Sequence, residues 1–281
     1  MQAIQVENLS KTFRVKKKEK GMAGSIKAIL HPQREEIQAV NGVSFQVEEG
    51  EMLAFIGPNG AGKSTTIKML TGILYPDGGR VEVLGIDPTK KRKQLAYQIG
   101  TVFGQKEQLW THLTPYDNFR FFGAIYDLSE RETEVRIKEL AQRFELETFI
   151  DTPVRNLSLG QRIRCEIVAS LIHKPKVLFL DEPTIGLDPV VKENIRSLIM
   201  QMNREEHTTI FLTSHDVGDI EKLCRRIIIV NAGRIVLDDS MEKLKEHYLQ
   251  GKGVEDSDAL DISLEDIIMD IYRAEGRTAA V

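Results

Sequence analysis

One run of eight residues has the composition and spacing of a phosphate-binding loop. It fits the pattern G-x-x-x-x-G-K-[ST] and comprises Gly57, Pro58, Asn59, Gly60, Ala61, Gly62, Lys63 and Ser64. Glycines let the backbone curl closely around an anion at positions where a Cβ would obstruct it. The lysine ammonium is suited to the β and γ phosphates of a nucleotide, and the serine hydroxyl is suited to Mg²⁺. The run therefore predicts a site for a nucleoside triphosphate and its magnesium ion.

Two adjacent carboxylates supply the second half of this chemistry. Asp181 and Glu182 follow an apolar run that predicts a buried strand. In a sheet that already carries a phosphate loop, the carboxyl end of such a strand lies beside the ligand crevice. Asp181 is suited to hold the Mg²⁺ shell, and Glu182 to orient and deprotonate the attacking water. The alternative is that the two acids only cap the helix that follows.

A histidine follows another predicted strand, and strands and helices alternate around all these groups. By the same reasoning as for the acids, His215 can reach the γ phosphate, although a lone histidine is more often structural. The expected strands are residues 52–56, 98–103, 176–180 and 208–213, and the expected helices are residues 64–74, 158–173 and 189–205. Their alternation predicts a parallel sheet covered on both faces.

The flanking regions differ in character from this sheet. Residues 3–8, 43–48 and 80–84 predict strands in the first third of the chain. The middle block is helical: Thr114 precedes a proline at the first helical position, and Ser129 with Glu132 forms a capping box, so residues 114–127 and 129–144 are expected to be helices. The chain closes with a hairpin around residues 231–233 and with helices at residues 241–248 and 263–273.

The composition excludes several classes of protein. With 281 residues, of which 41% are hydrophobic and 28% charged, the chain is neither disordered nor a small disulfide scaffold. No apolar run approaches the ~18 residues that span a bilayer. The net charge of −4 argues against nucleic acid as the main partner. Only Cys165 and Cys224 are present, and no signal-peptide pattern opens the chain, so a reducing cytoplasm fits best.

Residues 14–38 interrupt the succession of predicted strands and helices, because their apolar residues show little periodicity. The segment begins with a basic cluster that comprises Arg14, Lys16, Lys17, Lys18 and Lys20. Segments of this length without secondary structure are either functional or disordered. We expect a solvated insertion; the alternative is that the basic groups contact a membrane partner or an anionic lipid surface.

A kinase, a GTPase or a motor would fit the residues named so far, and five further residues separate these possibilities. Leu157-Ser158-Leu159-Gly160-Gln161 stands before the acidic strand and opens a helix. Together with Gln105, with Gly186-Leu187-Asp188 and with His215, it resembles the ATP-binding cassette family in order and spacing over about residues 3–240. The segments correspond to the family's phosphate loop, Q-loop, signature, Walker B strand, D-loop and H-loop.

The resemblance implies a fold and a domain arrangement. The fold class is α/β: a P-loop NTPase core with a mixed sheet, an antiparallel β-subdomain and an inserted α-helical subdomain at about residues 106–172. Residues 1–240 would form the nucleotide-binding domain, with the basic insertion at 14–38. Residues 241–281 would form a short helical extension.

The resemblance also implies roles for individual residues. ATP would be bound by Phe13, by the phosphate loop with Thr65, and, from a second cassette, by Ser158, Gly160, Gln161 and Asp188. Glu182, His215 and Gln105 would be catalytic, and Ser64, Gln105 and Asp181 would hold Mg²⁺. Phe13 would stack on adenine; the alternative is that it belongs to the core of its strand. Leu159 replaces the usual signature glycine; we expect retained activity, with room for an asymmetric pair of sites.

A single phosphate loop and a single signature imply a dimer of cassettes, either of identical or of related chains. The overall pattern resembles bacterial export cassettes that pair with separate permeases at the cytoplasmic face of the membrane. Leu109, Trp110, Phe119, Phe121 and Phe122 lie where the family docks its permease; the alternative for Phe119, Phe121 and Phe122 is that they form the core of the helical block. The alternatives are an importer cassette and a soluble cassette ATPase that acts on nucleic acid or ribosomes. A subunit that binds ATP without turnover would be expected to lack Glu182.

Overall fold

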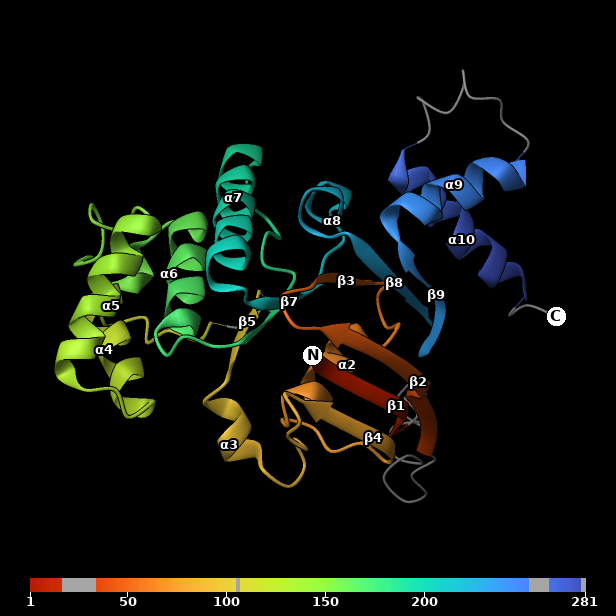
Figure 1. The fold of residues 1–281 in the computed structure, drawn as a ribbon, viewed down its shortest axis with the longest axis horizontal. Helices are drawn as coiled ribbons and strands as arrows, with labels where there is room; N and C mark the ends of the chain where they lie inside the picture. The colour runs from red at the N-terminus through yellow and green to blue at the C-terminus, as the bar shows by residue number, and fades with distance from the viewer. Residues whose placement is uncertain (17–33, 105–106, 253–262, 279–281) are drawn as a thin grey trace, which may run out of the picture.

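The computed structural model describes residues 1–16, 34–104, 107–252 and 263–278, which form two sheets flanked by helices (Figure 1). The strands are β1 (Gln2–Lys16), β2 (Arg34–Glu48), β3 (Met52–Ile56), β4 (Gly78–Val83), β5 (Ile99–Phe103), β6 (Val177–Asp181), β7 (Thr209–Thr213), β8 (Arg226–Asn231) and β9 (Arg234–Ser240). The helices are α2 (Lys63–Leu70), α3 (Arg92–Ala96), α4 (Pro115–Ile125), α5 (Glu130–Arg143), α6 (Leu159–Leu171), α7 (Pro189–Glu206), α8 (Val217–Leu223), α9 (Met241–Lys252) and α10 (Leu264–Thr278). A 3₁₀ turn spans Val154–Asn156.

The larger sheet has the order β5-β6-β7-β3-β8-β9 and positions the candidate site. Its first five strands are parallel, and β9 pairs antiparallel with β8. The inner strands β6 and β7 are buried almost along their whole length, as their continuous apolar sequences predict. The predicted α/β fold class, with a mixed sheet and a separate antiparallel sheet, is confirmed.

The smaller sheet, with the order β2-β1-β4, packs against the larger one through aromatic side chains. Phe45 of β2 lies with its ring centroid 5.6 Å from that of Phe55 and 6.0 Å from that of Phe211. Phe55 on β3 alternates with Ala54 and Ile56, which belong to the core on the opposite face of the larger sheet. The period of two in β3 therefore supplies both cores, and this fixes the register of the strand that leads into the glycine-rich loop.

Helices α4, α5 and α6 form the helical block, whose start signals are those expected from the sequence. The Thr114 hydroxyl accepts a hydrogen bond from the backbone N–H of Asp117, with Pro115 at the first helical position. Ser129 and Glu132 form the predicted capping box at the start of α5. Each such cap satisfies an N–H group that has no partner inside the helix. In Figure 1 the block lies toward the β5 edge of the larger sheet, whereas α9 and α10 lie toward its β9 edge.

The ends of the segment 14–38 differ from our expectation of little regular structure. β1 continues to Lys16 and β2 begins at Arg34, with Phe13 opposite Ile37 and Arg14 opposite Glu36. The sequence did not predict these strand ends because this part of the hairpin exposes both of its faces. On one face Ile37 is 48% exposed, and on the other Arg14 Nε donates to Glu36 Oε1 at 2.9 Å between two exposed side chains. A strand without a buried face has no reason to alternate in polarity. Residues 17–33, which carry the remaining lysines, lie outside the described residues.

The two last helices share a core with α8. Leu244 of α9 and Leu264 and Ile267 of α10 are buried in the cluster that also contains Ile220 of α8. The expected helices at 241–248 and 263–273 are thus present and extend further, while the division into 1–240 and 241–281 stays a prediction. None of the helices in the described ranges combines the length and the apolarity needed to cross a bilayer.

Candidate active site

The glycine-rich loop connects β3 to α2 and closely approaches neighbouring backbone. A Cβ added to Gly57 would lie 2.2 Å from the carbonyl oxygen of Val230, and one added to Gly62 would lie 2.2 Å from that of Ala39. Gly62 also adopts φ = 103°, a left-handed conformation that other residues rarely adopt, directly before the first residue of α2. Both glycines are therefore required by space, and the loop is held tightly between β2 and β8.

Lys63 places its ammonium inside this loop. Its side chain is buried, and Nζ donates to the carbonyl oxygen of Gly57 at 2.7 Å and to that of Pro58 at 3.3 Å. Burial lowers the pKa of Lys63, and the negative charges of Glu182 and Asp181 oppose this shift. The loop thus encloses a cation at the N-terminus of a helix, an arrangement that fits the phosphates of a nucleotide.

The two predicted acids lie at the carboxyl end of β6, beside the end of β7. Asp181 is opposite Thr213 in the register, and the Thr213 hydroxyl donates to Asp181 Oδ1 at 2.5 Å. The backbone N–H of Glu182 donates to the carbonyl oxygen of Thr213 at 3.0 Å. Because β6 and β7 are parallel neighbours, both strands bring their last residues to the same edge of the sheet.

His215, Glu182 and Lys63 converge at this edge. His215 Nε2 lies 3.1 Å from Glu182 Oε1 and 3.3 Å from Lys63 Nζ. The Glu182 side chain is 14% exposed and that of His215 is 44% exposed, so the histidine faces the outside of the group. The three residues are far apart in the sequence and were predicted separately. Their convergence places a cation, a carboxylate and an imidazole around one point.

A cavity of about 240 Å³ opens beside Glu182 and His215. Since a water molecule occupies roughly 30 Å³ of liquid, this space admits several waters next to the carboxylate. The cavity is lined by Glu182, Thr184, Ile185, Gly186, Lys192, Ser214, His215 and Asp216. Hydrolysis requires a water beside a general base, and the cavity offers that access.

Glu182 has an unusual backbone conformation, with φ = 56°. For a residue with a Cβ, the left-handed region costs about 1–2 kcal/mol. Strained residues persist where the surrounding structure fixes them, and they concentrate at functional sites. The hydrogen bond from the Glu182 N–H to Thr213 is one of the contacts that hold this conformation.

The donors predicted for Mg²⁺ are hard oxygen atoms, as this cation requires. Ser64 is half-buried in the first turn of α2, and Asp181 has its carboxylate oriented by Thr213. Mg²⁺ is usually held by one or two such protein groups together with phosphate oxygens and waters, so the residues present fit the ion. Gln105, the third predicted ligand, lies outside the described residues.

The signature residues open α6, where Ser158 is the N-cap. Ser158 Oγ accepts from the Gln161 N–H at 3.3 Å, and Gln161 Oε1 accepts from the Ser158 N–H at 2.9 Å. A Cβ on Gly160 would lie 2.8 Å from Cγ1 of Val191 in α7, so this glycine allows the two helices to approach. Leu159 is the first residue of α6 and is 46% exposed. Its helical backbone suits any L-residue, so the backbone conformation does not require a glycine at this position.

Asp188 and Phe13, the two remaining predicted residues, lie at the margins of the site. Asp188 is the N-cap of α7, and its Oδ1 accepts from the N–H groups of Val190 and Val191 at 3.1 and 3.0 Å. Phe13 is 36% exposed on β1 and lies opposite Ile37. Two residues further along β2, the carbonyl of Ala39 borders Gly62, so the hairpin that carries Phe13 leads to the phosphate loop.

Sequence reasoning missed several residues around the site. Thr213 orients Asp181, and a buried group centred on Arg196 and Asp219 lies behind the strand ends. These contacts join residues 23 to 35 positions apart, and no motif marks them. Thr213 had one available signal, its place at the end of a predicted strand next to the acidic one, but register is set only by the assembled sheet.

Glu166 is a further buried acid, on the core side of α6. It is 6% exposed, and its Oε1 accepts from the N–H of Gln108 at 3.4 Å. Burial raises the pKa of Glu166 to about 7. A carboxyl whose pKa is raised by folding stabilises the fold below its unfolded pKa, and this contribution is lost as the pH rises through the folded value.

We therefore expect the contribution of Glu166 to the free energy of unfolding to fall by on the order of 3 kcal/mol between about pH 4.5 and pH 7, while buried His173, whose pKa is lowered to about 4, contributes in the opposite direction up to about pH 6.5. Glu166→Gln, which mimics the protonated form, is expected to flatten this slope in denaturant titrations at the two pH values. Glu130→Gln on α5 is the control, because the Glu130 side chain is 79% exposed. Equal slopes in the wild type and in Glu166→Gln would contradict this assignment.

The sequence comparisons agree on one family. Residues 40–185 match the family model described as ABC transporter. The chain is 34% identical over 210 residues to the ABC transporter ATP-binding protein NatA of Bacillus subtilis, a match that covers 75% of this chain and 85% of NatA. It is 36% identical over 211 residues to the Nod factor export ATP-binding protein I of Burkholderia lata, covering 74% of this chain and 67% of that protein. Several further relatives are matched over less than two thirds of their own length.

A comparison with solved structures gives the same result for the fold. The chain superposes with a TM-score of 0.71 and 26% identity on an ATP-binding cassette solved as a dimer in a post-hydrolysis state, bound to ADP and Pi. The superposition covers 85% of this chain and 98% of that cassette. The fold of this chain is therefore that of a known ATP-binding cassette.

Proposed function

Because this chain belongs to the ABC transporter family of ATP-binding cassettes, we propose that it is the ATP-hydrolysing subunit of a transporter that exports its substrate through separate membrane permeases. The predicted resemblance to the family, and with it ATP as the nucleotide, is confirmed by the match of residues 40–185. The convergence of Lys63, Glu182 and His215 at the edge of the parallel sheet is the observation that carries the proposal.

In this proposal, the phosphate loop holds the triphosphate and the sheet edge performs the hydrolysis. Lys63 and the loop N–H groups bind the β and γ phosphates, with Ser64 and Asp181 as ligands of Mg²⁺, which neutralises charge on the phosphate oxygens when it is bound. Glu182 accepts the proton of the attacking water. His215, 3.1 Å from Glu182, contacts the γ phosphate.

The signature residues complete a site on a second cassette. Ser158, Gly160 and Gln161 open a helix whose N-terminus attracts an anion, and the capping box described above keeps that terminus ordered. Asp188 begins the neighbouring helix α7, so the signature and the D-loop lie side by side through Gly160 and Val191. The relative solved as a dimer supports this arrangement. Phe13, on the hairpin beside the phosphate loop, is proposed to contact the adenine.

The helical block offers a surface for the permease. Trp110 is 46% exposed and Phe121 is 44% exposed, and their ring centroids are 4.3 Å apart in an edge-to-face arrangement. Leu109 and Phe119, by contrast, are buried in the core, which excludes them from a contact with a partner. We assign Trp110 and Phe121 to the permease contact, at the cytoplasmic face of the membrane. Export as the direction is supported by the relative named for Nod factor export.

Purification of the tagged chain from gently solubilised membranes of its native host tests this function. We expect multi-span permease subunits to be recovered, and Trp110→Ala to reduce their recovery at least about tenfold, because large aromatic side chains dominate protein interfaces. Val135→Ala is the matched control, since Val135 is an apolar residue of the same block that is 63% exposed. Recovery of ribosomal or DNA-repair proteins from the soluble fraction, without permeases, would contradict the proposal.

A further inference from the structure

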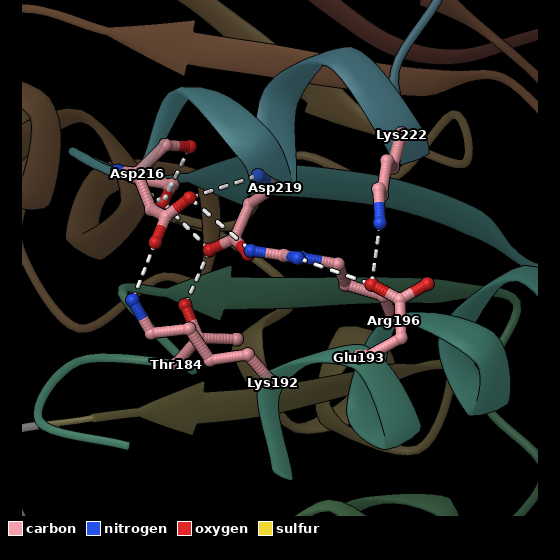
Figure 2. Close-up of polar contacts among 8 residues, drawn as sticks. Thr184, Lys192, Glu193, Arg196, Asp216, Asp219 and Lys222 are labelled. Atoms are coloured by element: carbon pink, nitrogen blue, oxygen red, sulfur yellow. Dashed lines mark hydrogen bonds and ion pairs between the residues drawn. The ribbon is translucent and has the colours of Figure 1, made fainter. Parts of the chain in front are cut away.

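A buried polar cluster joins α7 to the loop and helix that follow β7 (Figure 2). Asp219 of α8 is at its centre and is fully buried, with 0% of its surface exposed. Its Oδ1 accepts from Nε of Arg196 at 2.6 Å. Its Oδ2 accepts from the hydroxyl of Ser214 at 2.9 Å and also from the hydroxyl of Thr184. One carboxylate therefore binds three side chains from three different segments.

Two further acids, Asp216 and Glu193, and two further bases, Lys192 and Lys222, surround this centre. Arg196 Nη2 donates to Asp216 Oδ1 at 3.2 Å, and Lys192 forms an ion pair with Asp216 Oδ2. On the other side, Arg196 Nη1 lies 3.3 Å from Glu193 Oε2, which also pairs with Lys222 at 2.6 Å. The guanidinium of Arg196 is thus held by carboxylates of α7, α8 and the loop between β7 and α8, as Figure 2 shows.

The energetics of such a cluster favour a role beyond stability. Withdrawing two charges from water offsets most of their mutual attraction, so a buried ion pair is often no more stabilising than well-packed apolar side chains. The pair instead restricts the relative positions of the segments that carry its two side chains, because a charge-assisted hydrogen bond forms only within a narrow range of distances and angles. A fully satisfied cluster of this kind holds its segments in one arrangement.

The segments in question carry the two proposed catalytic groups. Thr184 follows Glu182 by two residues, and Ser214 immediately precedes His215. Because Oδ2 of Asp219 binds both hydroxyls, it joins the segment of Glu182 to the segment of His215. Arg196, on Oδ1, fixes the orientation of the carboxylate.

We propose that Arg196, Asp219 and Thr184 form a positioning unit that sets the contact between Glu182 and His215, which lie 3.1 Å apart, and thereby the rate of ATP hydrolysis. The three residues act through the two segments that they join. This inference rests on the roles proposed for Glu182 and His215.

Thr184→Val is the sharpest variant, because it removes one hydroxyl, keeps the shape of the side chain and leaves the ion pairs intact. We expect kcat for ATP hydrolysis to fall about ten- to a hundredfold, as when a reacting group is misplaced by a fraction of an ångström to an ångström. KM for ATP is expected to stay within about twofold, since Lys63 and its loop are untouched. Thr184→Ser, which keeps the donor, is expected to restore kcat.

A pair of arginine variants separates positioning from stability. Arg196→Gln removes a guanidinium that is 9% exposed, and Arg136→Gln removes one that is 4% exposed and pairs with Glu206 at the far end of α7. Both are expected to lower the melting temperature. Only Arg196→Gln is expected to lower kcat at a temperature where both variants are folded, again with KM retained.

Glu182→Gln is assayed beside them to separate the two proposals. The positioning unit is refuted if Thr184→Val and Arg196→Gln hydrolyse ATP at the wild-type rate while Glu182→Gln is inactive. It is equally refuted if Arg136→Gln lowers kcat as much as Arg196→Gln does, since the effect would then follow stability alone. If Glu182→Gln is fully active, the role proposed for Glu182 fails, and the positioning unit fails with it.

Discussion

Glu182→Gln is expected to lower kcat for ATP hydrolysis by about 10²- to 10⁴-fold, the range that a positioned general base contributes. Binding of ATP is expected to persist, because Lys63 and the phosphate loop are unchanged. Glutamine keeps the Cβ and the length of the side chain, so the left-handed backbone at φ = 56° is equally strained in both proteins. The variant therefore isolates the charge. Steady-state phosphate release and fluorescent-nucleotide binding measure the two quantities.

Its control is Glu147→Gln, a change of the same kind at an exposed residue of the turns that follow α5. Because Glu182→Gln no longer hydrolyses ATP, we expect this variant to stay in the ATP-bound, dimeric form. Size-exclusion chromatography with and without ATP detects the dimer. A Glu182→Gln protein that releases phosphate at the wild-type rate would falsify the assignment of Glu182 as the base.

Lys63→Met is expected to weaken ATP binding by about a hundredfold or more, since charge-assisted hydrogen bonds contribute about 1.5–3 kcal/mol each and the ammonium meets two phosphates. Methionine fills most of the volume of the buried aliphatic chain. It also removes a cation whose pKa is lowered by burial, so the melting temperature without nucleotide is not expected to fall much. Calorimetric titration with ATP measures the dissociation constant.

Lys68→Met is the matched control, because Lys68 lies in the last turn of the same helix. It removes one positive charge from α2 and leaves the loop intact, so its dissociation constant for ATP is expected to equal that of the wild type. An unchanged constant in Lys63→Met would exclude the phosphate loop as the principal nucleotide site.

The parts of the site that were predictable are those that local sequence specifies. The phosphate loop and the pair Asp181 and Glu182 each form one contiguous segment, and a buried strand before each segment places it at the edge of the sheet. Parallel pairing then brings His215 to the same edge, so its contact with Glu182 follows from topology. The capping signals at Thr114 and Ser129 were equally local.

The parts that were not predictable depend on distant residues or on an absent pattern. Arg196 and Asp219 meet only because α7 and α8 pack together. From the sequence alone, an arginine on a highly charged helix is expected to face solvent. The hairpin ends around Phe13 and Ile37 lack alternation because both faces meet solvent. α8 has only seven residues, too few for a helical period to appear in the sequence.

The strained backbone of Glu182 also bears on how the protein can change by mutation. Glycine would relax the steric strain at φ = 56°, but it would delete the carboxylate. Selection for thermal stability alone would therefore favour glycine at this position. The resulting protein would be more stable but would no longer hydrolyse ATP. Libraries screened for heat tolerance need an activity filter here, because robustness and turnover conflict at Glu182.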